Sequence, residues 1–211
     1  RQHHNNETIA DILASWNEGE LSGYLLEITI AILRKKEGDD YLLDKVLDKA
    51  GNKGTGSWSS KSAFDLGSVN TMMSDAVFAR YISSFKSERI KLAAQVTAYQ
   101  SASDLSHDII KSAYRAARML NHHQGFELIR QASDAFSWEL KLDHIARIWT
   151  NGCIIRSTLM EELIEVFKKA GNMLESEKIV DTFSQSEEAV SLYLKYVIES
   201  KIPSPVVSSA N

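Results

Sequence analysis

The sequence predicts an all-α fold built around one very long helix, and three observations support this prediction. The chain has two prolines, Pro203 and Pro205, so the strongest helix breaker is absent from everything before them. Apolar residues recur at helical spacing in several stretches, and none of the sequence gives a convincing strand. With 211 residues, 44% of them apolar, the chain can bury a substantial core.

The first part of the chain predicts two amphipathic helices followed by a third. Apolar residues at spacings of three, four and seven mark the first two helices: Ile9, Ile12, Leu13 and Trp16, then Leu25, Ile28, Ile32 and Leu33. Leu42–Ala50 is also predicted to be helical, with Gly51 as its C-terminal cap.

The long helix is predicted from Asp104 to about Phe136, with 108–132 as its minimum extent. The segment has no proline and one interior glycine, Gly125. It keeps an apolar stripe along one face: Ile109, Ile110, Ala113, Tyr114, Ala117, Leu120, Phe126, Ile129 and Ala132.

Four shorter helices are expected after it: Asp143–Trp149, Ser157–Lys169, Glu175–Phe183 and Ser186–Ser200. The polar pair Ser184-Gln185 is expected to separate the last two. Two weak internal echoes suggest a tandem repeat of helical units: 26–33 with 155–159, and 68–71 with 202–205.

Composition makes several classes of function improbable. A net charge of −4 argues against a nucleic-acid partner. No apolar run reaches the roughly 20 residues that cross a bilayer, and a single cysteine, Cys153, fits a reducing compartment such as the cytoplasm. The adjacent pairs His3-His4 and His122-His123 lack the i, i+4 spacing of a zinc-binding helix, so no metal site is expected. The neighbours Ser106, His107 and Asp108 point in different directions on a helix and cannot form a catalytic relay.

The stretch "DKAGNKGTGSW" (48–58) contains three glycines in six residues. It is not a Walker phosphate loop, because Ser57-Trp58 follows the last glycine where Lys-Ser/Thr is required. It is not a dinucleotide fingerprint either, because no βαβ unit surrounds it. Two interpretations stay open: a turn between helices, or an anion grip in which Lys53 supplies charge and Thr55 a hydroxyl near a helix N-terminus.

Six motifs in the same order resemble the C-terminal helical domain of decarboxylating 6-phosphogluconate dehydrogenase. They cover nearly the whole chain: "WNEGELSGYLLEIT" (16–29), "DKAGNKGTGSW" (48–58), "SDAVFARYISSFKSERI" (74–90), "QGFELIRQAS" (124–133), "IARIWTNGCIIRS" (145–157) and "IPSP" (202–205).

The resemblance implies a single domain, 1–211, that is all α, is built around a very long helix as a tandem repeat, and forms a homodimer. The family oxidises 6-phosphogluconate with NADP and decarboxylates the product to ribulose 5-phosphate. Its phosphate-contacting residues match Lys53, Thr55 and Arg80 here. A guanidinium, an ammonium and a hydroxyl together suit a phosphate dianion.

The resemblance also implies what lies elsewhere in the enzyme. The family's NADP-binding Rossmann domain and its catalytic helix precede this region, and its C-terminal tail follows it. No catalytic residue is therefore expected in this chain, and the isolated chain is expected to be inactive.

The sequence departs from the family pattern at Ser57, at Ser68-Val-Asn-Thr71 and near Thr150. Two other functions stay open: a non-catalytic helical dimerisation module of the same fold, or another 3-hydroxyacid dehydrogenase of the superfamily.

Overall fold

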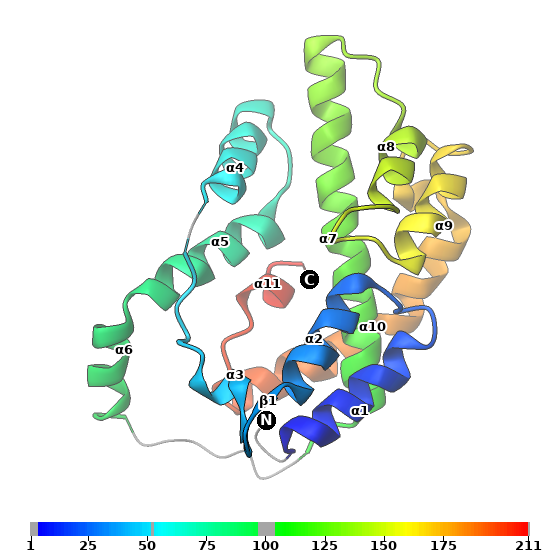
Figure 1. Ribbon diagram of the computed structural model, residues 1–211. Coiled ribbons are helices and arrows are strands. Elements are labelled where there is room, and N and C mark those ends of the chain that lie inside the picture. The colour runs from blue at the N-terminus through cyan, green and yellow to red at the C-terminus, as the bar shows by residue number, and fades with distance from the viewer. Residues whose placement is uncertain (1–3, 52, 97–103, 211) are drawn as a thin grey trace. The chain divides into compact units, whose positions relative to one another are not determined.

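The computed structural model describes residues 4–51, 53–96 and 104–210, and most of them are helical, so the predicted all-α class is confirmed (Figure 1). The described strands are β1 (Lys36–Glu37) and β2 (Asp40–Tyr41), which pair as a short antiparallel hairpin. This hairpin was not predicted from the sequence. Gly38 makes its turn possible, because its φ of 63° lies in the left-handed region that favours glycine.

The chain forms two compact units, each assembled from two segments. The first unit combines the chain up to Leu47 with Leu140–Ser176, and the second combines Asp48–Glu139 with the chain from Glu177 onward.

The first unit contains two packed helix pairs. Its elements, besides the hairpin, are α1 (Asn6–Asn17), α2 (Tyr24–Arg34), α3 (Leu42–Lys45), α8 (Leu142–Trp149), α9 (Thr158–Phe167) and the 3-10 helix η1 (Met173–Glu175). Helix α1 packs on α2, and α8 packs on α9.

The two helix pairs of the first unit meet where α2 and α9 begin. The Tyr24 N–H donates to the Arg156 carbonyl at 3.1 Å, and the Thr158 N–H donates to the Ser22 carbonyl at 3.1 Å. The Arg156 guanidinium also lies 4.0 Å from the centre of the Tyr24 ring and 3.2 Å from a Glu27 carboxylate oxygen. This contact joins the segments of the first predicted echo, and the tandem repeat itself stays a prediction.

The second unit is built on two long helices that lie side by side (Figure 1): α7 (His107–Phe136) and α10 (Glu177–Glu199). Its other helices are α4 (Thr55–Leu66), α5 (Thr71–Ser84), α6 (Lys86–Ala93) and α11 (Pro205–Ser208). Helix α7 covers 108–132 without a break at Gly125, as predicted. It begins where the Ser106 hydroxyl accepts the Asp108 N–H at 3.2 Å, and it ends at Ser137, whose φ is 54°.

Two predicted helix boundaries are wrong. Helix α10 is continuous through Ser184 and Gln185, because Ser186 is fully buried and its hydroxyl donates to the Thr182 carbonyl one turn earlier, at 2.8 Å. A serine whose hydroxyl is satisfied by its own helix does not interrupt it. The helix predicted over Leu42–Ala50 ends at Lys45. Side chains of α5 and α6 bind the Ala50 N–H and the Asp48 carbonyl, and these bonds take the place of helical hydrogen bonds.

Candidate functional site

The candidate site lies where the glycine-rich stretch leads into α4. Helix α4 begins at Thr55, and its N-cap residue Gly54 has a φ of 92°. An L-residue with a side chain rarely adopts this conformation, so glycine is the suitable residue here. Gly54 has no side chain that could accept a hydrogen bond from the first turn of α4. The first N–H groups of a helix have no acceptor within the helix and carry the positive end of its dipole, so a helix N-terminus favours an anion.

Helices α4 and α5 approach each other very closely near this end. A Cβ atom built on Gly56 would lie only 2.5 Å from Cγ2 of Val77. One turn further into α4, the Ser60 hydroxyl accepts a hydrogen bond from the Ser74 hydroxyl at 2.9 Å. As the residue numbers rise along α4 they fall along α5, so the helices are antiparallel. The last turns of α5 therefore extend past the N-terminus of α4.

Arg80 lies one turn beyond Val77 on α5, and its side chain reaches the glycine-rich stretch. Its Nη2 donates to the carbonyl of Gly51. Lys53 and Thr55 follow Gly51 by two and four residues, and the side chains of Lys53, Thr55 and Arg80 are all exposed. A guanidinium has five N–H donors, so the bond to Gly51 leaves others for a ligand. The three residues named from the sequence thus belong to one loop and the helix that touches it.

An acidic residue holds the start of this loop against helix α6. The Asp48 carboxylate accepts hydrogen bonds from Nζ of Lys86 and, at 2.9 Å, from Nη1 of Arg89. These two hydrogen bonds, that of Lys86 first, lower the pKa of Asp48 from 3.8 to about 2. Asp48 therefore keeps its negative charge at any pH at which an enzyme is normally assayed.

Asp48, Lys86 and Arg89 were not predicted from the sequence as members of the site. Lys86 and Arg89 lie 38 and 41 residues from Asp48, so no local sequence pattern predicts that they pair with it. The only available signal was that these residues belong to two of the six motifs that carried the resemblance.

The arrangement suits a phosphate dianion. It combines an ammonium, a guanidinium, a hydroxyl and a helix N-terminus within one loop and the adjoining helix. Within the described residues, no group of three His, Cys, Asp or Glu side chains could hold a metal ion. None of the helices in the described ranges combines the length and apolar content needed to span a membrane.

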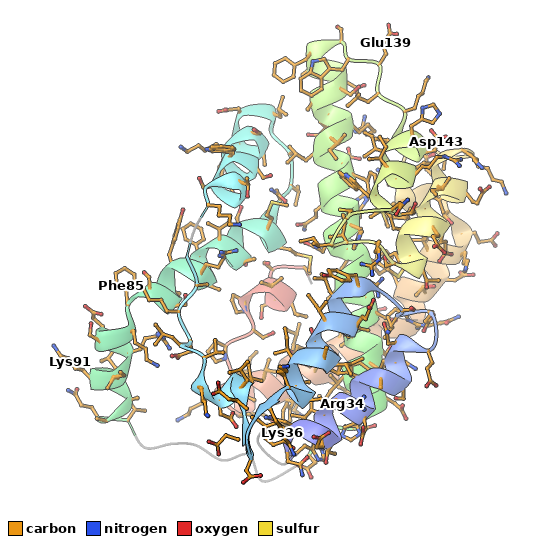
Figure 2. All side chains as sticks on the ribbon, viewed as in Figure 1. Arg34, Lys36, Phe85, Lys91, Glu139 and Asp143 are labelled. Atoms are coloured by element: carbon orange, nitrogen blue, oxygen red, sulfur yellow. The ribbon has the colours of Figure 1, made fainter. Side chains whose placement is uncertain are left out.

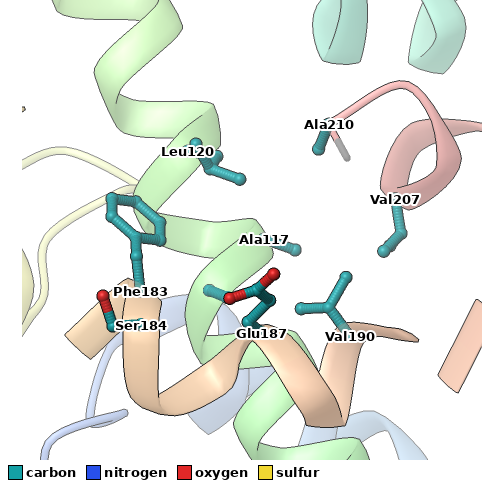
Figure 3. A pocket seen from close by; sticks show the side chains of 9 residues that line it. Ala117, Leu120, Phe183, Ser184, Glu187, Val190, Val207 and Ala210 are labelled. Atoms are coloured by element: carbon teal, nitrogen blue, oxygen red, sulfur yellow. The ribbon is translucent and has the colours of Figure 1, made fainter. Parts of the chain in front are cut away.

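Two hollows lie elsewhere in the second unit, and neither is lined by Lys53, Thr55 or Arg80. The first has a volume of about 250 Å³, and in Figure 3 the Glu187 carboxylate lies among the apolar side chains of Leu120, Phe183 and Val190. An apolar wall with a carboxylate does not suit a phosphate. The second, of about 300 Å³, is lined mainly by α4, α5 and the turn between them and includes Asp75.

Comparisons with known proteins all point to one family. The model of the family "6-phosphogluconate dehydrogenase, C-terminal domain" matches residues 1–211. A decarboxylating 6-phosphogluconate dehydrogenase of Lactococcus lactis subsp. lactis (strain IL1403) is 40% identical over 97% of this chain and 45% of its own length. The corresponding protein of Shigella flexneri is 36% identical over 97% of this chain and 46% of its own length.

A solved structure agrees in fold. Plasmodium falciparum 6-phosphogluconate dehydrogenase, whose structures include complexes with its cofactor NADP+ and its substrate 6-phosphogluconate, superposes with a TM-score of 0.93 at 30% identity. The match covers 98% of this chain and 47% of that protein. The chain thus spans about half the length of the relatives it matches.

Proposed function

We propose that this chain, which belongs to the family of 6-phosphogluconate dehydrogenase C-terminal domains, is the substrate-binding and dimer-forming domain of an NADP-dependent, decarboxylating 6-phosphogluconate dehydrogenase. The whole enzyme would oxidise 6-phosphogluconate at C3, decarboxylate the resulting 3-keto acid and release ribulose 5-phosphate and CO2. Residues 1–211 would act in it as one domain. The single free cysteine fits a location in the reducing cytoplasm.

The observation that supports this proposal most directly is the meeting of Arg80 with the loop that carries Lys53 and Thr55. The phosphate would sit at the N-terminus of α4, with Lys53 supplying charge and Thr55 a directed hydrogen bond. Arg80 would bind the phosphate from the α5 side. These residues fix one end of the sugar acid, so that its reacting carbon is held in one place.

The described residues do not form a site for NADP. A Rossmann fold needs parallel strands joined by helices, whereas the described sheet is one hairpin with two residues in each strand. NADP would therefore bind to parts of the enzyme outside this chain.

The phosphate grip is tested by Arg80→Ala in the full-length enzyme. One charge-assisted hydrogen bond contributes about 1.5–3 kcal/mol, so the KM for 6-phosphogluconate should rise roughly 10- to 100-fold. The KM for NADP should stay the same. Arg80→Lys should recover only part of the loss, because an ammonium restores charge without the planar, paired geometry.

Lys91→Ala is the matched control, since Lys91 is an exposed cation on the neighbouring helix α6 (Figure 2). The Lys91→Ala variant should keep the normal KM for 6-phosphogluconate. If Arg80→Ala instead leaves the KM unchanged and only lowers the melting temperature, Arg80 is structural and the phosphate site is wrongly assigned.

We also propose that the enzyme is a homodimer, because the second unit leaves large apolar side chains on α4 to α6 exposed. Phe64 is 84% exposed, Phe78 60%, and Phe85, at the junction of α5 and α6 (Figure 2), 55%. Exposed apolar side chains in such number are typical of an interface. Light scattering of the full-length enzyme across a dilution series should give the mass of two chains, whereas a monomer at every concentration would contradict the proposal.

A further inference from the structure

The described residues of the loop that leads through Lys53 to Thr55 have no regular secondary structure before α4, yet several hydrogen bonds hold this loop in place. The Asp48 carboxylate binds Lys86 and Arg89, and the Asp48 carbonyl accepts a further hydrogen bond from Nη2 of Arg89 at 2.8 Å. One guanidinium therefore grips both the side chain and the backbone of the same loop residue.

Ser83, on the last turn of α5, provides the second fastening. Its hydroxyl accepts the Ala50 N–H at 3.0 Å and donates to the Arg80 carbonyl at 2.7 Å. The Ser83 carbonyl accepts a further bond from Nη2 of Arg89 at 3.1 Å. Ser83 thus connects the loop backbone, the backbone of Arg80 and the guanidinium that holds Asp48.

Together these contacts set the position of the loop relative to Arg80. Gly51, which accepts the Arg80 side chain, directly follows the residue that Ser83 holds, and Lys53 lies two residues further on. If the bonds at Asp48 and Ala50 were lost, Lys53 would still be present, but its position relative to Arg80 on α5 would no longer be fixed.

We propose that Asp48, Ser83 and Arg89 are positioning residues that hold the loop where Lys53 and Arg80 act on one phosphate. They do not touch the phosphate themselves. This inference rests on the proposed function, because it assigns the three residues a role in phosphate binding. Asp48 has a particular electrostatic effect, since it occupies two cations, Lys86 and Arg89, that would otherwise offer the phosphate a competing position.

The experiment uses the full-length enzyme and measures kcat and both KM values for Asp48→Asn and Ser83→Ala. The KM for 6-phosphogluconate should rise roughly 3- to 10-fold, because a displaced loop weakens the phosphate contacts. The value of kcat and the KM for NADP should stay within about twofold of the normal values. Asp48→Glu should restore part of the affinity, because it keeps the charge that binds Arg89.

Ser84→Ala is a close control for Ser83→Ala. The Ser84 hydroxyl donates to the Tyr81 carbonyl at 2.7 Å, the same kind of bond that Ser83 makes within α5, and Ser84 is exposed. It should leave the KM for 6-phosphogluconate unchanged. The double variant Asp48→Asn/Arg89→Gln should cost no more than the more severe of its single variants, because both remove the same fastening.

Three results would overturn the inference. If Asp48→Asn and Ser83→Ala match Ser84→Ala while Arg80→Ala raises the KM, the phosphate site stands but these residues do not position it. If Arg80→Ala has no effect either, the inference fails together with the proposed function. If kcat and both KM values worsen in parallel with a lower melting temperature, the residues have only a general structural role.

Discussion

Replacing Gly56 with alanine would place a methyl group where α5 already lies. The new Cβ would be 2.5 Å from Cγ2 of Val77, whereas ordinary van der Waals contacts lie between 3.4 and 4 Å. One of the two helices must therefore move by about 1 Å. Valine cannot easily turn its methyl away, because its β-branched side chain has few accessible rotamers.

The expected loss of stability follows from comparing this substitution with a glycine-to-alanine change that creates no close contact. Gly125 lies inside α7, and a Cβ built on it meets nothing within 4 Å. Alanine there should stabilise the chain by about 0.8–1 kcal/mol through helix propensity alone. At Gly56 a similar gain is opposed by overpacking of about 1–3 kcal/mol. The two variants should therefore differ by about 1–3 kcal/mol, or roughly 2–12 °C in melting temperature for a chain of this size.

Thermal unfolding of Gly56→Ala and Gly125→Ala tests the stability difference. A third variant, Gly56→Ala/Val77→Ala, removes the clashing methyl groups and should be more stable than the sum of the two single changes predicts. In the full-length enzyme, Gly56→Ala should also raise the KM for 6-phosphogluconate, because Arg80 moves with α5. Equal melting temperatures for Gly56→Ala and Gly125→Ala would refute the close contact between α4 and α5.

Two further predictions concern pH and activity. Burial lowers the pKa of His122, and its Nε2 has no hydrogen-bond partner among the described residues, so the unfolded chain binds a proton more readily than the folded one. The free energy of unfolding should therefore fall as the pH drops below about 6.5. Urea titrations at several pH values should show a smaller fall for His122→Gln than for the exposed control His144→Gln. If the free energy of unfolding changes with pH in the same way for both variants, this assignment is wrong. The purified 211-residue chain should form no NADPH from 6-phosphogluconate, and turnover above a mock purification would place catalytic residues within it.

The long helix was predictable because its signal is local. The apolar stripe from Ile109 to Ala132 repeats at the helical period, and Gly125 interrupts neither the stripe nor the backbone. The predicted break at Ser184-Gln185 failed for the opposite reason. Polar residues suggested a loop, but Ser186 is buried and its hydroxyl donates to the Thr182 carbonyl within α10.

The candidate site was predictable in its residue types and not in its construction. Lys53, Thr55 and Arg80 followed from a resemblance spread over six motifs, since an isolated arginine on a helix carries no such meaning. The fastening by Asp48 and Arg89 depends on two segments 41 residues apart, and no periodicity or short motif encodes such a contact. The same contact explains why Leu42–Ala50 is not one helix, because tertiary hydrogen bonds outweigh a modest local preference.

The three glycines of the stretch have different roles, and the difference shows how the site is built. Gly54 adopts a left-handed conformation at the start of α4, and Gly56 lets α5 approach. A Cβ on Gly51 meets nothing within 4 Å, and this residue contributes its carbonyl to Arg80. The last two turns of α5 thus supply the proposed phosphate ligand Arg80, the packing contact Val77 and the fastening residue Ser83. Because one rigid helix carries all three, a shift of α5 displaces the guanidinium and the loop together, whereas release of Asp48 displaces the loop alone.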